Sequence, residues 1–187
     1  MPDFGASPGQ TIGPFFHYAL PYPGDRELVP LGAENSIRLR GHVFDGAGVG
    51  VPDALIEIRQ AHPSGIVPEV EGSLRRGGSS FTGWGRSSTD PTGLYWFCTL
   101  RPAPTRDRAA AFFAVTVFAR GLLDRLFTRI YLPGQDAACA RDPLLKTLLP
   151  EDAAKMVAHQ EDIETLHFDI HLQGPQESIF LAFPGYR

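Results

Sequence analysis

The sequence predicts a mainly β protein: a sandwich of two mostly antiparallel sheets with long loops, one or two short helices and an extended N-terminal arm. Three observations predict this fold. Glycine and proline account for 20 and 17 of the 187 residues without any repeat period, which is typical of many turns joining short strands. About seven strand-like runs lie between these turns. Signals for the start of a helix come only late in the chain.

Length and composition limit the class of protein. A single domain over residues 1–187 is the simplest division, because a chain of this length buries roughly 70% of the surface that its unfolded form exposes. The net charge of −4, without a basic stripe, argues against a nucleic-acid partner. No apolar run is long enough for a membrane span and no secretory leader pattern opens the chain. We therefore expect a reducing, cytoplasmic setting and a buried, inert thiol at Cys98.

Residues 1–36 are expected to form the extended arm. Prolines recur through this segment, so long helices and central strands are disfavoured. Large apolar side chains recur among the prolines, and each would contribute roughly 1.5–3 kcal/mol on burial, enough together to offset ordering the arm. These side chains are Phe4, Phe15, Phe16, Tyr18, Leu20 and Tyr22. We expect the arm to dock on a surface, either of its own domain or of a partner chain.

The first strands are expected at residues 37–44 and 54–59, where apolar and polar residues alternate. A turn at Asp45-Gly46 lies between them, so the two runs predict a hairpin. Residues 62–88 are rich in glycine, serine and proline and predict a long loop. The aromatic run at residues 94–100 predicts the next strand.

Residues 109–120 are expected to form the central strand. They are almost uninterrupted apolar sequence, and their phenylalanine, valine and threonine content with the closing Gly121 favours a strand over a short buried helix. The continuous run predicts burial on both faces. Residues 126–132 are also strand-like, so we expect the two runs to pair as the floor of the β core.

The C-terminal quarter carries the helix signals and the closing strands. Asp142-Pro143 resembles an N-cap followed by proline at the first helical position, and predicts a short turn through residue 148. A second helix is expected over residues 150–159, because acidic residues occupy its first turn. Closing strands are expected at residues 166–172 and 178–183.

A candidate metal set lies in the first closing strand. A period of two puts His167, Asp169 and His171 on one strand face, and two histidines with a carboxylate form a recognised open set for iron or zinc. The alternative is that Phe168 and Ile170 face the core while the three polar residues only face water. Metal binding would require second-shell partners, which an outer strand face seldom supplies.

Arg129 is a fixed cation inside an otherwise apolar strand. Burying an unpaired guanidinium is costly, so either an internal carboxylate pairs with Arg129 or an anionic ligand meets it at a sheet edge or subunit boundary. Asp53 and Glu57, spaced four apart, are candidates for paired acids, although solvated carboxylates on strands are far commoner than catalytic ones.

Several motifs resemble, in collinear order from about residue 8 to 183, the intradiol ring-cleavage dioxygenases. The motifs are Gly41-His-Val-Phe-Asp-Gly46, Pro52-Asp-Ala-Leu-Ile-Glu-Ile-Arg-Gln-Ala61, Trp84-Gly-Arg86 and Thr89-Asp-x-x-Gly-Leu-Tyr-Trp-Phe-Cys-Thr-Leu-Arg-Pro102. Matches to the metal-free alpha subunits of that family add Gln10-Thr-Ile-Gly-Pro-Phe15, Phe118-Ala-Arg-Gly121 and Phe127-Thr-Arg-Ile-Tyr131. The family fold is a β-sandwich, which agrees with the prediction from strand patterns.

The resemblance implies that this chain has lost the family's metal site. The family holds ferric iron with two tyrosines and two histidines. Hard Fe(III) suits the anionic oxygens of the tyrosines. The matching positions are Val67, Thr105, Ala114 and Thr116. Valine and alanine have no donor atom and a neutral hydroxyl is a poor ligand. The resemblance therefore implies no iron and no catalytic residue in this chain, with Fe(III) held by a partner beta subunit.

The same resemblance assigns this chain a supporting part in the site. It implies that Thr11, Gly13 and Pro14 approach the partner's active site, that Phe15 stands where a tyrosine is often found, and that Arg129 is the arginine associated with substrate. The arm becomes a strap between subunits.

The implied reaction is O2-dependent opening of protocatechuate to 3-carboxy-cis,cis-muconate. It is carried out by a larger hetero-oligomer, in which this chain alone is inactive. A non-enzymatic β-sandwich scaffold or binding module is the alternative.

Overall fold

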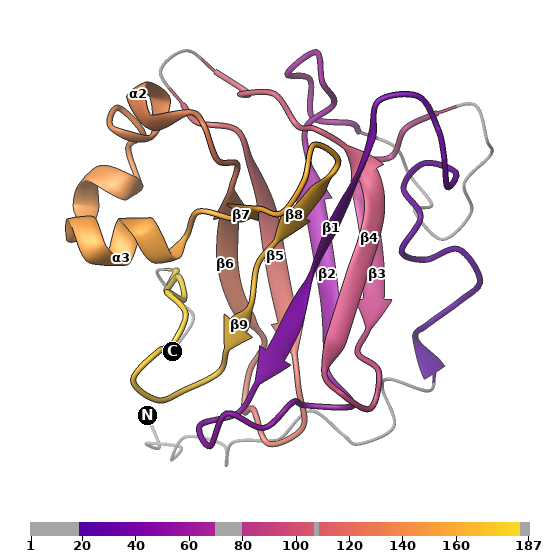
Figure 1. Ribbon diagram of the computed structural model, residues 1–187, viewed down its shortest axis with the longest axis vertical. Helices are drawn as coiled ribbons and strands as arrows, with labels where there is room; N and C mark the ends of the chain where they lie inside the picture. The colour runs from indigo at the N-terminus through magenta and orange to yellow at the C-terminus, as the bar shows by residue number, and fades with distance from the viewer. Residues whose placement is uncertain (1–18, 70–79, 107–108, 184–187) are drawn as a thin grey trace, which may run out of the picture.

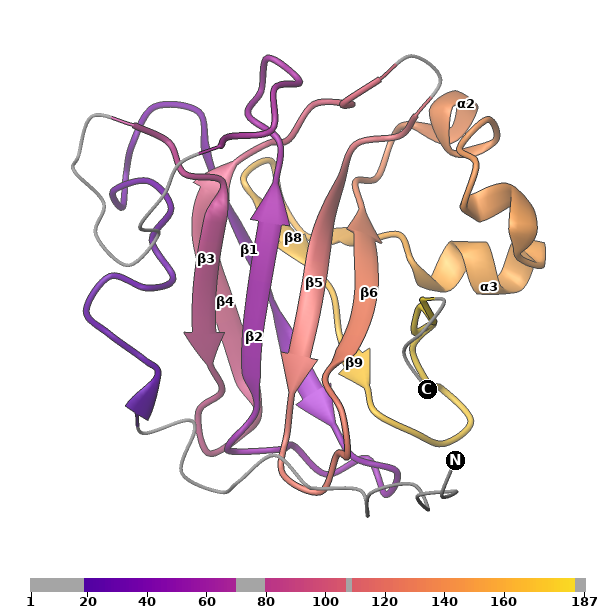
Figure 2. The same cartoon turned by 180° about the vertical axis from the view of Figure 1, so that it is seen from behind.

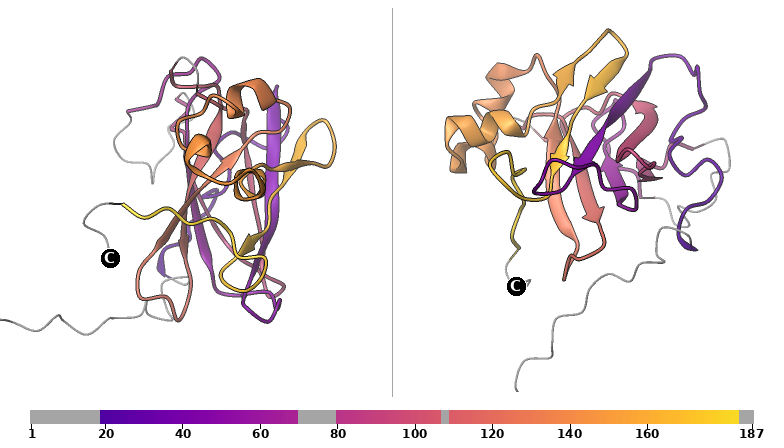
Figure 3. Two further views of the ribbon diagram at one scale, coloured as in Figure 1. Left: turned by 90° about the vertical axis from the view of Figure 1, so that its left-hand side faces the viewer. Right: turned by 60° about the horizontal axis from the view of Figure 1, so that its bottom comes forward.

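The computed structural model describes residues 19–69, 80–106 and 109–183 as two stacked β-sheets with a small helical corner (Figure 1). Viewed from the side, the sheets form two layers (Figure 3). The strands are β1 Ser36–Phe44, β2 Leu55–Gln60, β3 Trp84–Ser88, β4 Leu94–Leu100, β5 Phe112–Phe118, β6 Leu126–Tyr131, β7 His159–Gln160, β8 Thr165–His167 and β9 Ile170–His171. The helices are α2 Asp136–Cys139, the 3-10 turn η1 Leu145–Thr147 and α3 Pro150–Lys155.

The strand orders confirm the predicted sandwich. One sheet has the order β4-β1-β8-β7, with β9 also paired to β1, and the other has the order β3-β2-β5-β6. Pairing is antiparallel except where β1 runs parallel to β8 and β9. Figure 2 shows the β3-β2-β5-β6 sheet in front, with α2 and α3 beyond β6.

Alternating side chains from both sheets form the core between the layers. Because successive side chains on a strand point to opposite faces, each strand contributes every second residue. The inward residues of β1, β4, β2 and β5 are fully or almost fully buried. They are Leu39 and Val43, Tyr95 and Phe97, Ile56 and Ile58, and Phe113, Val115 and Val117. This core holds the two outer faces, where the polar side chains gather, in fixed positions.

The prediction that the first two strands form a hairpin is wrong. β1 and β2 belong to different sheets, and only a single bridge, Phe44 to Gly50, closes the turn between them. Gly50 approaches another loop so closely that a Cβ there would lie 2.0 Å from the carbonyl oxygen of Thr92. From this point the chain crosses to the other layer, where the Ala54 amide donates to the Thr89 hydroxyl at 2.9 Å.

The central strand is confirmed, but its expected burial on both faces is wrong. In β5 the inward residues are buried while the intervening residues, Phe112, Ala114, Thr116 and Phe118, are only half-buried. Its pairing with β6 is confirmed, with Ala114 opposite Arg129. The apolar sequence of β5 therefore has an open side, and that side faces a cavity.

The C-terminal quarter differs from the sequence prediction in detail. The second helix ends at Lys155, and the first is only the turn η1, although the Asp142 carboxylate does accept from the amide of Leu144 at 3.0 Å. α2 was not predicted. Residues 178–183 form no strand, although the Leu181 amide donates to the Phe127 carbonyl at 2.8 Å.

The expected strand at residues 166–172 is interrupted, so β8 and β9 are separate. At the break the Asp169 carboxylate accepts from the His42 amide at 2.7 Å, in place of a backbone partner. Gly41 permits the close approach, because a Cβ there would lie 1.8 Å from the Phe168 carbonyl oxygen. The buried Tyr95 hydroxyl donates to that same oxygen at 2.5 Å. The break is therefore a packed feature of the sheet.

The described part of the arm docks on its own domain. Glu27 forms a bridge with Cys98 of β4, Leu28 is buried, and the Cys98 amide donates to the Arg26 carbonyl at 2.9 Å. The buried thiol expected at Cys98 is thereby confirmed. The rest of the arm, which includes Phe4, Phe15, Phe16 and Tyr18, lies outside the described residues. In the described ranges, no helix has the length and apolar character to cross a membrane.

Candidate functional site

The outer face of the β3-β2-β5-β6 sheet carries a cavity of 460 Å³. Its walls come from β2, β3, β5 and β6 and from the segment after β9, which contributes Leu181 and Phe183. A volume of this order suits a small organic ligand. Both half-buried residues of mid-β5, Ala114 and Thr116, open on it.

Two arginines flank Ala114 in this cavity. The register pairs Ala114 with Arg59 of β2 on one side and with Arg129 of β6 on the other. Directly opposed residues lie on the same face of a sheet, so both arginines share the face of Ala114; Arg59 Nη2 donates to the Pro68 carbonyl at 3.2 Å. Each strand is about 4.8 Å from the next. This row of cation, methyl group and cation favours an anionic ligand.

Sequence reasoning missed Arg59. The strand containing it was predicted, but its register with β5 was not, because the expected hairpin paired it with β1 instead. The signal that could have identified Arg59 is the alternation of inward and outward residues in β2 and β5, once these two strands are known to pair.

Arg129 is held in place by an aromatic ring and a phenol. Its guanidinium carbon lies 4.1 Å from the centroid of the Phe112 ring, and Nη1 donates to the Tyr131 hydroxyl at 3.2 Å. Tyr131 in turn donates to Asp142 at 3.1 Å. No carboxylate of the described residues lies within ion-pairing distance of Arg129. The internal carboxylate considered from sequence is therefore reached only through a phenol.

Burial raises the pKa of Tyr131 to about 12, although the hydrogen bond from Arg129 opposes the rise. Tyr131 is consequently a neutral phenol at neutral pH, and it can accept from Arg129 while donating to Asp142. The arrangement fixes the cation without neutralising it, so Arg129 keeps a net positive charge towards the cavity.

The two acids of the second strand region are not paired with each other. Glu57 accepts from Arg86 Nε at 2.9 Å and from Nη2 at 2.5 Å, whereas Asp53 forms an ion pair with Arg120 at 2.5 Å. Each carboxylate is occupied by its own arginine. Catalysis by this pair of acids is not what the structure supports.

A second cavity of 170 Å³ adjoins the first and contains three of the four positions matched to lost iron ligands. Val67, Thr105 and Ala114 line it, and it shares Arg59, Phe112 and Ala114 with the larger cavity. Thr116, the fourth position, lies two residues along β5 in the larger cavity. The structure thus brings the four positions to one end of the open face.

The side chains at these positions do not fit a ferric ion. Two are hydrocarbons and two are neutral hydroxyls, whereas a hard trivalent cation requires anionic oxygen or imidazole ligands. Gln60, which also lines the smaller cavity, is engaged elsewhere: its amide nitrogen donates to the Leu100 carbonyl at 2.8 Å, and its oxygen accepts from Thr99 at 2.6 Å. The side chains of these two cavities therefore do not suit an iron site.

The candidate metal set from sequence is wrong in one member. His167 and Asp169 do lie together, but the third residue is His42 of β1, and the ligand atoms of the three are within 4.8 Å of one another. His171 instead stacks on Phe44, with ring centroids 5.0 Å apart. In the described part of the chain this is the one such group, and it lies on the opposite sheet from the cavities.

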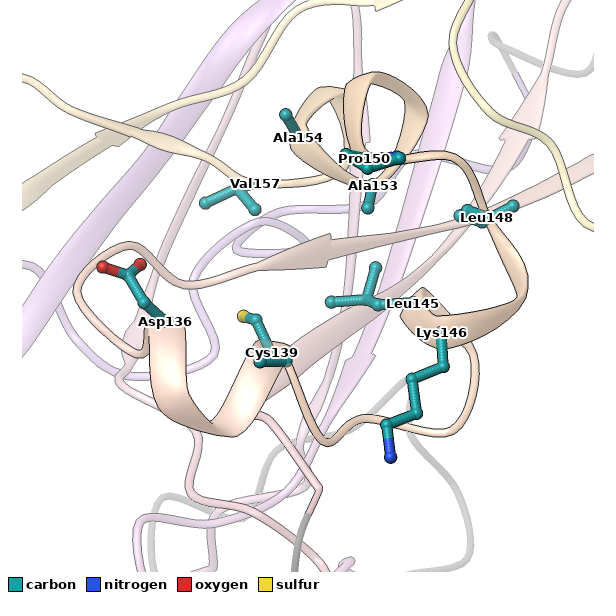
Figure 4. A pocket seen from close by; sticks show the side chains of 10 residues that line it. Asp136, Cys139, Leu145, Lys146, Leu148, Pro150, Ala153, Ala154 and Val157 are labelled. Atoms are coloured by element: carbon teal, nitrogen blue, oxygen red, sulfur yellow. The ribbon is translucent and has the colours of Figure 1, made fainter.

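A third cavity, of 400 Å³, lies in the helical corner (Figure 4). Its lining comes from α2, η1 and α3 and is mostly apolar, with Leu145 and Val157 among its side chains. Burial raises the pKa of the Cys139 thiol, and the nearby Asp142 and Asp136 carboxylates add to the rise. The thiol is therefore a poor nucleophile at neutral pH.

The remaining residues implied by the resemblance, Thr11, Gly13, Pro14 and Phe15, lie outside the described residues. Their approach to a partner's active site stays a prediction. The described candidates are Arg129 and the four positions Val67, Thr105, Ala114 and Thr116, and they line the two adjoining cavities.

Comparison with curated proteins finds relatives along almost the whole chain. A protocatechuate 3,4-dioxygenase alpha chain from Burkholderia cepacia is 33% identical over 190 residues, which span 93% of this chain and 95% of that one. An alpha chain of the same name from Pseudomonas putida is 28% identical and spans 95% and 96%. A protocatechuate 3,4-dioxygenase beta chain from Burkholderia cepacia is 30% identical and spans 92% of this chain but 77% of its own length.

Comparison with solved structures supports the fold. The dioxygenase domain of a dioxygenase carbohydrate-binding protein fusion from Streptomyces sp. SirexAA-E superposes with a TM-score of 0.57 at 19% identity, covering 89% of this chain and 97% of that domain. No protein-family model matches the chain.

Proposed function

The chain belongs to the family of protocatechuate 3,4-dioxygenase alpha chains, and from this premise we propose that it is the subunit without iron of an enzyme that opens protocatechuate between its two hydroxyls. The reaction consumes O2 and yields 3-carboxy-cis,cis-muconate. A beta-type partner chain holds Fe(III), and the chain described here completes the substrate pocket. Alone, it is inactive.

One observation carries this proposal: the open face of β5 has the cavities of a ligand site but not the donors of a metal site. Val67, Thr105 and Ala114 converge on one cavity, and none of them supplies an anionic ligand. The group of side chains that does suit a metal lies on the other sheet. The iron required for ring cleavage is therefore assigned to the partner.

Arg129 is proposed to bind the ring carboxylate of protocatechuate. Its guanidinium is oriented by Phe112 and Tyr131 but remains uncompensated by any described carboxylate. A charge-assisted hydrogen bond to a carboxylate contributes about 1.5–3 kcal/mol, or about 10- to 150-fold in affinity. Arg59, on the other side of Ala114, adds positive potential to the same face.

Exposed apolar side chains around the cavities support a partner chain at this face. Ile66 is 69% exposed, Val67 42% and Phe183 46%. Large exposed apolar groups that border a cavity are typical of subunit contacts. We assign the iron-holding chain to this contact, with the N-terminal arm as a strap across it, and place the pair in a larger cytoplasmic hetero-oligomer.

Expression with and without the partner tests the proposal. We expect ring cleavage of protocatechuate, followed by loss of its ultraviolet absorbance, only when this chain is combined with the iron-holding chain of the same organism. Iron analysis should give about one ferric ion per pair of chains, and none in this chain alone.

Two results would contradict the proposal. One is ring cleavage by this chain alone. The other is a chain that does not co-purify with the iron-holding partner, which is the outcome that a non-enzymatic scaffold predicts. The relatives do not favour that alternative.

A further inference from the structure

The outer face of the β4-β1-β8-β7 sheet carries a group of imidazoles and carboxylates that the proposed function does not use. His42 lies on β1, His167 ends β8, and Asp169 lies in the break between β8 and β9. His167 Nε2 is 2.9 Å from Asp169 Oδ1, and His42 Nδ1 is 3.6 Å from the same oxygen. Three potential ligand atoms therefore converge on one point of the surface.

The backbone holds these three side chains in place. Parallel pairing sets Arg40 opposite His167, which puts His42 beside the break in the neighbouring strand. Asp169 Oδ1 accepts from the His42 amide at 2.7 Å, so the carboxylate cannot swing away freely. The site is thus built from two segments that are far apart in sequence and are locked by the close approach of Gly41 to Phe168.

A second carboxylate orients His167. Its Nδ1 lies 3.0 Å from Glu161 Oε1, and Glu161 is itself held by Arg40 through Nε at 2.9 Å and Nη2 at 2.8 Å. A metal-binding histidine nearly always donates its other ring N–H to such a partner, which selects the tautomer and raises the basicity of the ligating nitrogen. This Arg40–Glu161–His167 relay leaves Nε2 as the ligating atom.

We propose that His42 Nδ1, His167 Nε2 and one Asp169 oxygen bind a divalent transition-metal ion of the zinc type. Imidazole nitrogens and a carboxylate oxygen match Zn²⁺, whose ligands lie about 2.0–2.2 Å from the ion and hence roughly 3–4 Å from one another. Side-chain exposures of 33%, 28% and 33% for His42, His167 and Asp169 leave room for water to complete the coordination shell. The ion would fasten β1 to the C-terminal strands.

The proposal does not rest on the proposed function. The site is on the opposite sheet from Arg129 and the lost-ligand positions. Zinc uptake can therefore fail while ring cleavage is observed, and the reverse is also possible.

Zinc titration of the full-length protein tests the site. The chain is purified alone or with its iron-holding partner, treated with a chelator and titrated with Zn²⁺ by calorimetry. Variants of this chain, combined with the unchanged partner, are titrated in the same way. We expect each chain to bind one zinc ion, with binding saturated at a free Zn²⁺ concentration well below about 1 mM. The midpoint temperature of thermal unfolding should rise when zinc binds. His42→Gln and His167→Gln should abolish this uptake, and Glu161→Gln should weaken it by about 10- to 100-fold.

His171→Gln is the matched control, because His171 is on the same sheet face but stacks on Phe44. It should bind zinc as the wild type does. The proposal is overturned if the wild type shows no saturable uptake, if the His42 and His167 variants keep it, or if His171→Gln loses it equally. Should His167→Gln fail to fold, His42→Gln decides alone, because the His42 ring is part-exposed and lies against Asp169, Phe44 and His167.

Discussion

The outer faces of the two sheets suit ions of opposite sign. On β3-β2-β5-β6, Arg59 and Arg129 flank Ala114, so the face presents N–H donors and positive charge. On β4-β1-β8-β7, His42, His167 and Asp169 present lone pairs. Both faces use the same strand geometry, in which opposed residues meet side by side. The sandwich therefore positions side chains in rows, and the residue types in a row decide which ligand it takes.

Removing the cation from the first face should have the largest effect. Arg129→Ala in the iron-containing complex should lower kcat/KM for protocatechuate by about 10- to 150-fold, because a charge-assisted hydrogen bond to the carboxylate is lost. Iron content should not change. Lysine should rescue only partly, because it lacks the planar fork of donors. Steady-state kinetics check both variants.

Arg40→Ala is the control on the opposite face. Its guanidinium binds Glu161 and is distant from the cavities in the fold, so ring-cleavage kinetics should stay at the wild-type value. Equal losses in the two variants would show that the faces are not separate in function, and unchanged kinetics for Arg129→Ala would remove it from the site.

The second face depends on the close backbone contact between Gly41 and Phe168. In Gly41→Ala the new methyl group would lie 1.8 Å from the Phe168 carbonyl oxygen, and backbone atoms cannot rotate away. We expect a loss of about 1–3 kcal/mol in the free energy of unfolding, measured by urea denaturation.

Gly46→Ala provides the comparison for that measurement. The three atoms nearest to its methyl group would all belong to the side chain of Gln173, which is flexible and can move. The cost should therefore be smaller than for Gly41→Ala. Equal stability of the two variants would show that β1 and the segment after β8 are not locked together as described.

The smallest effect is expected at Tyr131, which supports Arg129 from below the first face. Tyr131→Phe removes hydrogen bonds to Arg129 and Asp142 and should cost about 0.5–1.5 kcal/mol at neutral pH. The fall in kcat/KM should be less than for Arg129→Ala, since the guanidinium keeps its contact with Phe112.

The pH dependence of stability gives a separate check on Tyr131. Burial raises its pKa to about 12 in the fold, above the value of about 10 for an unfolded tyrosine. The neutral phenol therefore stabilises the fold fully below pH about 10, and this contribution is lost as the pH rises towards 12. Wild type should lose more stability than Tyr131→Phe across that interval, and parallel curves would contradict the assignment.

Most strands could be predicted because alternation and aromatic content are local properties. Residues 94–100 and 126–132 needed no knowledge of their neighbours, and the structure confirms them as β4 and β6 with at most one residue's difference. The prediction of a hairpin was wrong because the chain crosses to the other layer after the turn at Asp45-Gly46. A local turn pattern carries no information about the sheet that the next strand joins.

The candidate sites could be predicted only in part. Arg129 and the pair His167 and Asp169 stood out, because a charge inside an apolar run and a period of two are visible along the chain. Arg59 and His42 did not, because each becomes part of a site only through a neighbouring strand from a distant segment.

The sequence by itself determined the mainly β class, the positions of the main strands and the absence of iron-binding side chains at Val67, Thr105, Ala114 and Thr116. The class and the strands follow from the chemistry of individual residues and their spacing along the chain, and the four positions follow from the resemblance to the family. Only the tertiary structure decided that Ala114 lies between two arginines and that His42, not His171, joins His167 and Asp169. The reason is physical: which strands pair, and in what register, is settled by packing between segments that are distant in the chain.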